Sequence, residues 1–278
     1  MRAVAGVAAD VIREALSRRW FLAMAIGVTL LLAGIAIGLR LDVVDGALAA
    51  TRFFGASMSS DIRSVDVALR PIFKAAALLI YYGGIGFGLL LCADFGPLLL
   101  APGRIEHLLA LPVRRWELLA GTFAGVLALT VIGALYGAGG LCLILGLKAG
   151  VWTLRPVLAA LLASVTFSAL YAPMLAAALF VRSAAFSAAT GGFFFIAGIV
   201  ASYRADVARA FKPGAGRLVF EALTLPLPRV AALAESVGAI AAAQPVVPAR
   251  LGALIVGLLV FALAFLALAV WRFEQRDF

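Results

Sequence analysis

Charged side chains are scarce in this sequence. Asp, Glu, Lys and Arg make up 13% of 278 residues, whereas 65% are hydrophobic and the mean hydropathy is +1.12. A soluble globular protein is excluded, because a soluble domain would have to expose much of that apolar surface to water. The net charge of +9 is spread between apolar runs, which favours anionic lipid head groups over nucleic acid as its partner.

Lysine is rarer still. The chain has three lysines, Lys74, Lys148 and Lys212, and none of them follows a glycine. A phosphate-binding loop needs a Gly-Lys pair followed by Ser or Thr, so the sequence contains no such loop. We therefore expect no cofactor on this chain, and an ATP-driven process would need an ATPase, with its ATP and Mg²⁺, on another polypeptide.

Histidine and cysteine are equally sparse. His107 is the one histidine, and Cys92 and Cys142 both fall in apolar segments, where thiols pack as small side chains. Acid-base or metal chemistry requires several such groups together. The sequence predicts no catalytic and no metal-ligating residues.

Long uncharged runs are what the sequence has in abundance. A helix of about 20 apolar residues crosses the roughly 30 Å hydrocarbon core of a bilayer. Six runs meet this criterion, at 20–39, 75–93, 118–147, 157–181, 184–203 and 251–271. They predict an all-α integral membrane protein, with a single transmembrane domain over residues 1–278. The third run must tilt, extend beyond the bilayer, or break near Gly139 and Gly140, and Pro173 predicts a kink in the fourth.

The first 19 residues form an amphipathic pattern. Val4, Val7, Val11 and Ala15 recur at helical spacing, and the charged residues fall on the other face, which predicts a helix at the membrane interface. A signal peptide is the alternative. The following apolar run is too long for a signal peptide, and no small-residue cleavage site comes directly after it.

The polar segments differ in character. Residues 40–74 predict a solvated loop. Residues 204–250 predict short helices in the outer interface, since Val230, Leu233 and Val237 recur at helical spacing. The density of Lys and Arg favours a cytoplasmic location for both termini, for 94–116 and for the short link around Arg182.

The segment between the second and third runs reads APGRIEHLLALPVRRW over 101–116. It predicts a short amphipathic helix that ends at Pro112. The apolar side, which suits a hydrophobic groove in a partner, carries Ile105, Leu108, Leu109 and Leu111. The polar side carries Arg104, Glu106 and His107. A plain interfacial loop with arginines anchored to lipid explains the pattern equally well.

This segment resembles the coupling helix of permease subunits of type 2 ABC exporters. Members typically show acidic-x-Gly-Thr-hydrophobic-Glu-x-Leu-Leu, then Pro-Val-Ser-Arg and a Gly-Lys pair. The matching residues are Gly103, Ile105, Glu106, Leu108, Leu109, Pro112, Val113, Arg115 and Gly121. The departures are Ala101, Arg104, Arg114 and Thr122, which add positive charge and imply a more acidic groove on the partner. The N-terminal helix, the six runs, the broken apolar region before the last run and the ending 272–278 also look like this family. Within it, the coupling segment and the modest loops look most like the copper-enzyme-maturation subgroup.

The resemblance implies a partner and a site. A separate ABC ATPase, present in two copies, would bind the segment in the bacterial cytoplasmic (inner) membrane, and this permease would form a homodimer or pair with a paralogue. The implied ATPase-coupling residues are Gly103, Arg104, Ile105, Glu106, His107, Leu108, Leu109, Pro112, Arg114 and Arg115. The first, second and fifth spans would line the translocation path, with Tyr81, Tyr82, Phe193, Phe194 and Phe195.

Three other functions remain open. A mechanical scaffold would use the ATPase to signal to a periplasmic partner without moving a substrate. A secondary carrier or channel would need no ATPase, although no ionisable residue lies near the middle of the six runs to bind a coupling ion. A membrane-embedded enzyme would need a polar cluster that these runs lack.

Overall fold

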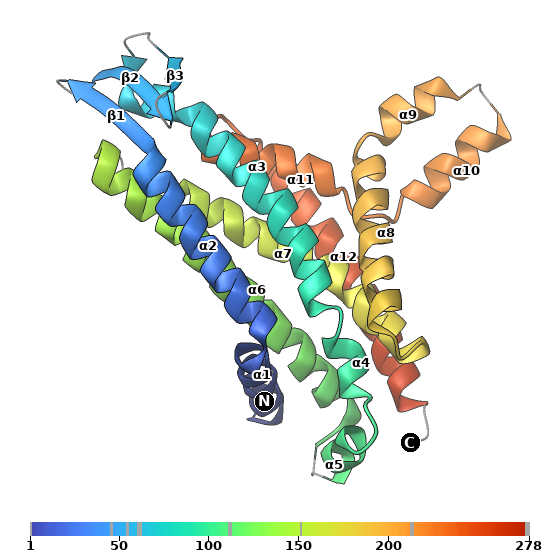
Figure 1. Cartoon of the computed structure of the whole chain (residues 1–278). Coiled ribbons are helices and arrows are strands. Elements are labelled where there is room, and N and C mark those ends of the chain that lie inside the picture. The colour runs from blue at the N-terminus through green and yellow to red at the C-terminus, as the bar shows by residue number, and fades with distance from the viewer. Residues whose placement is uncertain are drawn as a thin grey trace.

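A computed structural model describes residues 2–44, 47–53, 56–59, 63–110, 113–150, 152–211 and 214–275. Six helices are long and apolar enough to cross a membrane, which confirms the predicted all-α membrane architecture (Figure 1). The six long helices are α2 (Arg19–Gly38), α3 (Val65–Cys92), α6 (Arg115–Ala149), α7 (Arg155–Phe180), α8 (Ala184–Ser202) and α12 (Pro248–Glu274). The shorter helices are α1 (Arg2–Ser17), α4 (Phe95–Leu99), α5 (Arg104–Ala110), α9 (Arg204–Ala210), α10 (Ala215–Thr224) and α11 (Val230–Ala241).

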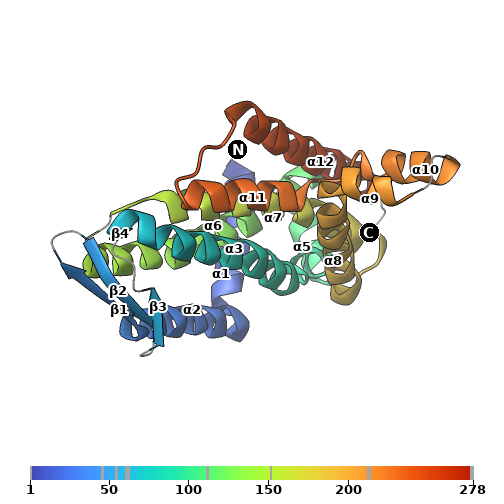
Figure 2. The same cartoon turned by 90° about the horizontal axis from the view of Figure 1, so that it is seen from above.

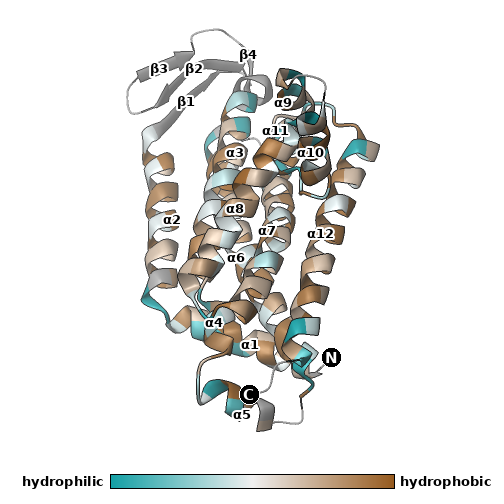
Figure 3. Cartoon of the chain, turned by 90° about the vertical axis from the view of Figure 1, so that its right-hand side faces the viewer, coloured by the Kyte–Doolittle hydropathy of each residue, from teal (hydrophilic) through white to brown (hydrophobic). Residues whose placement is uncertain are grey.

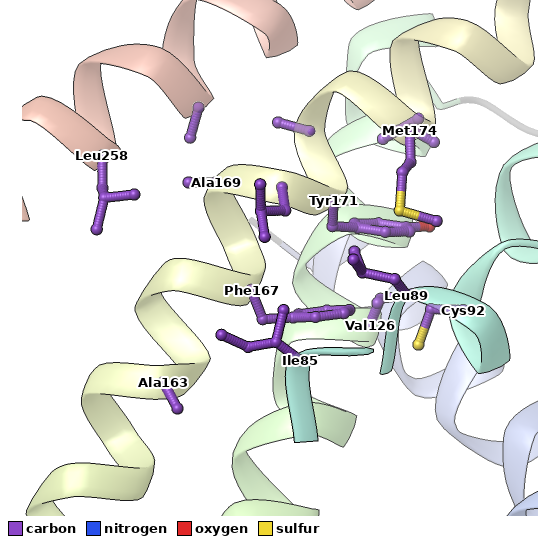
Figure 4. Close-up of a cluster of buried hydrophobic side chains, with 14 of the residues drawn as sticks. Ile85, Leu89, Cys92, Val126, Ala163, Phe167, Ala169, Tyr171, Met174 and Leu258 are labelled. Atoms are coloured by element: carbon purple, nitrogen blue, oxygen red, sulfur yellow. The ribbon is translucent and has the colours of Figure 1, made fainter. Parts of the chain in front are cut away.

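Helix α7 forms the centre of the bundle. Its span is 78% buried, against 6% for the span in α2, and it packs against α3, α6, α8, α11 and α12. Phe167 and Tyr171 stack with ring centroids 5.9 Å apart, and Ile85 and Leu89 of α3 meet them (Figure 4). An apolar composition on every side suits a helix that other helices enclose.

Helix α6 is continuous over 35 residues, so the third predicted span does not break at Gly139 and Gly140. At 1.5 Å per residue it is about 52 Å long and must extend beyond the hydrocarbon core. It ends at Gly150, whose φ of +68° places it in the left-handed region, where its N–H donates to the carbonyl of Gly146.

A small antiparallel sheet joins α2 to α3. Its strands are β1 (Leu39–Val44), β2 (Ala47–Phe53), β3 (Ala56–Ser59) and β4 (Arg63–Ser64), in the order β1-β2-β3 with β4 also paired to β2. The prediction of a loop over 40–74 was therefore wrong. Hydropathy marks where a helix crosses the bilayer, and α3 begins at Val65, before the predicted boundary at 75.

The short elements divide between the two ends of the bundle. Figure 1 places α1, α4, α5 and the end of α12 on one side, and the sheet, α9, α10 and α11 on the other. Hydrophilic residues gather at both ends in Figure 3, and the long helices between them are largely hydrophobic. Seen from above, α11 lies over α3 and α7, and α2 stands at the edge (Figure 2). The grouping of segments agrees with the predicted sidedness; which end faces the cytoplasm stays a prediction.

Candidate functional site

Helices α4 and α5 form a small projection at the end of the molecule that also holds α1. Helix α4 packs closely on α7, because a Cβ at Gly96 would lie 2.6 Å from the Cβ of Ala178. Leu100 is fully buried, and Gly103 turns the chain into α5 with φ +79°. At that φ a residue with a side chain would be strained, so Gly103 fixes the entry into α5 at low cost. The projection is thus anchored at its base.

Helix α1 is docked on α6. A Cβ at Gly121 would lie 2.6 Å from the Cβ of Val7, and a Cβ at Gly125 would lie 2.9 Å from the carbonyl oxygen of Ala8. Val11 is 3% exposed on the same side of α1. The two glycines therefore let α1 approach the backbone of α6, and this small-xxx-small pair serves a contact within the chain.

Three ion pairs connect the α1 region to the projection, and a fourth, between Arg18 and Glu14, lies within the α1 region. Arg104 Nη1 lies 2.7 Å from Glu14 Oε2, and Arg104 Nη2 lies 3.4 Å from Asp10 Oδ2. Arg18 Nη2 lies 3.0 Å from Glu14 Oε1, and Arg18 Nη1 lies 3.4 Å from Asp94 Oδ2. Glu14 thus bridges two arginines. We call Asp10, Glu14, Arg18, Asp94 and Arg104 the charge network.

The central members of the charge network are partly shielded from water. The side chains of Glu14 and Arg18 are each 21% exposed, and that of Arg104 is 29% exposed. Ion pairs shielded in this way are screened less by salt than fully exposed pairs. The guanidinium of Arg18 also lies 4.7 Å from the centre of the Phe95 ring in α4. The network therefore holds α1, α4 and α5 together.

These contacts revise the expected roles of three residues in α5. Arg104, expected to face an acidic groove on a partner, is turned toward the acids of α1. Ile105 is 3% exposed and Leu108 packs against the same core, so this part of the apolar side faces its own chain. Glu106 and Gly103 are exposed. His107 and Leu109 belong to α5 with side chains outside the described part, and Pro112 lies outside the described residues.

Arg114 and Arg115 stabilise helix ends. The backbone N–H of Arg114 donates to Glu117 Oε2 at 2.9 Å, as in a capping box at the start of α6. The side chain of Arg115 donates to the carbonyl oxygens of Phe273 and Glu274, at 3.3 and 3.2 Å, where a cation complements the end of α12.

An open hollow lies beside these helix ends. Its volume is about 550 Å³, and the residues that line it are Val113, Arg114, Arg115, Trp116 and Glu274. Trp116 is 40% exposed there. Together with the exposed side of α5, the hollow leaves this end of the molecule with a surface that a partner could contact.

The five residues expected along a translocation path differ in how far they are buried. Tyr81 is fully buried; its hydroxyl donates to the carbonyl of Val230 at 2.9 Å and pairs with the Thr166 hydroxyl at 3.0 Å. Tyr81 therefore joins α3, α7 and α11, and it lines no open surface in this structure.

The aromatic residues of α8 point in different directions. Phe193 is 64% exposed, whereas Phe194 packs against Phe261 and Phe265 of α12 with ring centroids 5.4 and 5.2 Å apart. The ring of Phe195 lies against that of Tyr82 in α3, with ring centroids 6.3 Å apart. Only Phe193 faces outward from the bundle among these three phenylalanines.

The sequence placed the acids of α1 on its polar face but did not predict that they pair with the projection. Asp10 and Glu14 of α1 and Arg18, which directly follows α1, recur every four residues, the spacing of neighbours on one helix face. That spacing was the available signal, but it did not reveal Arg104 as the partner.

No protein-family model matches the chain, and comparison with curated proteins also finds no match. The resemblance to ABC exporter permeases therefore rests on the motif residues between Gly103 and Gly121. Within the part of the chain that the structure describes, no three His, Cys, Asp or Glu side chains are grouped so that they could hold a metal ion.

Proposed function

We propose that this chain is the membrane-spanning subunit of an ATP-driven exporter, with a separate ATPase that binds ATP and Mg²⁺ and contacts the α5 end. The observation that carries the proposal is the charge network. It fixes a projecting helix to the rest of the bundle, and the outer side of that projection, at Glu106, stays exposed. A projection that is rigid at its base and open at its tip is suited to receive force from a partner.

The contacts supply a route for that force. A displacement of α5 would pull on α1 through Arg104 and Glu14, and α1 would carry it to α6 through Gly121 and Gly125. Helix α6 then runs without a break to the opposite end. Rigid-body movement of packed helices is a common way to convert a local change into a larger one.

A second permease subunit is part of this proposal. The span in α2 is only 6% buried, and a Cβ added at Gly83, Gly84 or Gly86 of α3 would meet nothing within 4 Å. Because these surfaces are apolar, either lipid or another protein could cover them. In the proposed exporter they would face the second copy or a paralogue, and the path would run between the two.

One observation favours mechanical signalling as a second candidate. Helix α2 continues directly into β1, and β4 continues directly into α3. Movement of either helix would therefore reach the sheet at the far end, where a periplasmic partner could respond without any substrate crossing the membrane.

Purification of the full chain from its host membrane tests the proposal. We expect an ATP-hydrolysing polypeptide in equal amount, with vanadate-sensitive turnover. Glu106→Arg should weaken its recovery at least tenfold, whereas Arg182→Ala, at an exposed arginine in the link between α7 and α8, should not. The proposal fails if Glu106→Arg retains full ATPase binding, or if the chain alone performs transport in vesicles. ATPase turnover without transport of any tested cargo would favour the signalling candidate.

A further inference from the structure

Helices α9 and α10 project from the bundle beside α8, at the end opposite α5 (Figure 1). Helix α10 has ten residues, about 15 Å, which is too short to cross a bilayer. Its large apolar side chains are nevertheless exposed: Leu218 by 69%, Val219 by 56% and Leu223 by 68%. An apolar face of this kind belongs in contact with lipid or with another protein.

A basic hollow lies between the two helices. Its volume is about 360 Å³, and the residues that line it are Arg204, Ala205, Ala208, Arg209, Arg217, Glu221 and Leu225. Leu225 is 67% exposed, so the hollow opens beside the apolar face of α10. Positive charge and apolar surface are thus adjacent.

The arginines at this end outnumber the acidic side chains that pair with them. Arg209 pairs with Asp206 at 3.2 Å, and Arg217 pairs with Glu221 at 2.8 Å. Arg204 has no acidic partner among the residues that the structure describes.

Arg229 is a second cation near Arg204, and it too has no acidic partner in the described part of the chain. Burial lowers the pKa of Arg229, and repulsion from Arg204 and Arg250 lowers it further. Arg250 pairs with Glu235 at 3.9 Å. Like charges that gather without enough counter-charges favour an anionic ligand.

We propose that the α9–α10 pair binds an anionic phospholipid, with its phosphate in the basic hollow and its acyl chains along the exposed face of α10. A soluble anion would use the arginines alone and would leave Leu218 and Leu223 in water. An anionic lipid uses both features, because an amphipathic helix at the interface combines apolar burial with attraction to charged head groups. This inference does not depend on the ATPase.

Lipid retention by the purified full chain tests the proposal. Phosphatidylglycerol is titrated into the detergent-solubilised protein and counted by native mass spectrometry. Each of Arg204→Ala and Arg217→Ala should weaken binding about fivefold, and the double variant about thirtyfold. Arg204→Lys should retain most of the affinity, which separates loss of charge from misfolding. Arg182→Ala, which removes a cation at the other end, should leave binding unchanged.

Three outcomes would overturn the proposal. Phosphatidylcholine could bind as tightly as phosphatidylglycerol, inorganic phosphate at equal concentration could displace the lipid completely, or the double variant could bind like the unaltered chain.

A second measurement addresses the apolar face. Tryptophan placed by Leu218→Trp should be quenched in vesicles of phosphatidylglycerol brominated on its acyl chains, beyond the quenching of the native tryptophans. Quenching of Leu218→Trp no greater than that of the unaltered chain would contradict lipid contact, and would assign the face to another protein, such as a second copy of this chain.

Discussion

At the α5 end, Arg18 and Arg104 each reach an acid from a distant part of the chain, whereas at the α9–α10 end Arg204 reaches none among the described residues. The two ends differ in how their charges are used. Paired, partly shielded charges fix helices relative to one another. Cations without acidic partners repel each other and leave room for an anion from outside the chain. The comparison therefore predicts opposite responses to mutation at the two ends.

The largest effect is expected at Glu14. Glu14→Arg would place a third cation beside Arg18 and Arg104, and we expect the free energy of unfolding to fall by about 3 kcal/mol. Thermal unfolding in detergent measures the change. The swap of Glu14→Arg with Arg104→Glu should recover at least half of the loss. Glu106→Arg, also in this region but exposed, should change stability by less than about 0.5 kcal/mol, and an equal loss there would remove the distinction between network and surface.

A smaller effect is expected where α1 docks. Gly125→Ala would bring a Cβ within 2.9 Å of the Ala8 carbonyl oxygen, and overpacking of this kind costs about 1–3 kcal/mol. Limited proteolysis should cut α1 faster in this variant. Gly133→Ala is a matched control in the same helix, since a Cβ there meets nothing within 4 Å. Equal protection of α1 in both variants would show that the glycine contact is dispensable.

Tyr81→Phe should have a moderate effect. It removes one hydroxyl, and with it the hydrogen bonds to Thr166 and Val230, at a cost of about 1 kcal/mol in the free energy of unfolding. Thermal unfolding of the variant measures it. A variant as stable as the unaltered chain would show that the junction of α3, α7 and α11 depends on packing alone.

The smallest effect, and the one of opposite sign, is expected at Arg204. Arg204→Ala relieves repulsion with Arg229 and removes no ion pair within the described residues, so stability without lipid should stay equal or rise by about 0.5 kcal/mol. Unfolding measured in lipid-free detergent checks this. A loss of about 1 kcal/mol or more would mean that both ends use their arginines for structure, and the comparison would fail.

The membrane spans were the most predictable part of the molecule. The predicted span 184–203 corresponds to α8 (Ala184–Ser202), and 251–271 lies within α12 (Pro248–Glu274), because a bilayer demands uninterrupted apolar residues. The start of α3 at Val65 was missed because a helix can continue beyond the apolar run that hydropathy detects.

The contacts of the candidate site were less predictable. Gly121 and Gly125 predicted a close helix contact, but glycine spacing does not identify the helix that makes it. Arg104 and Glu14 lie far apart in the sequence, and no local pattern connects such distant residues. The exposed position of Glu106 agrees with its predicted place on the polar side of the segment.

The unbroken course of α6 has a geometric consequence. A straight rod pivots as a whole, so the farther a point lies from the pivot, the greater its excursion. With a length of about 52 Å, a tilt of about 5° around the α1 end would shift the opposite tip by about 4.5 Å. A slight rocking at Arg115, where α6 begins, would thus become a movement of several ångströms at the other end of the helix.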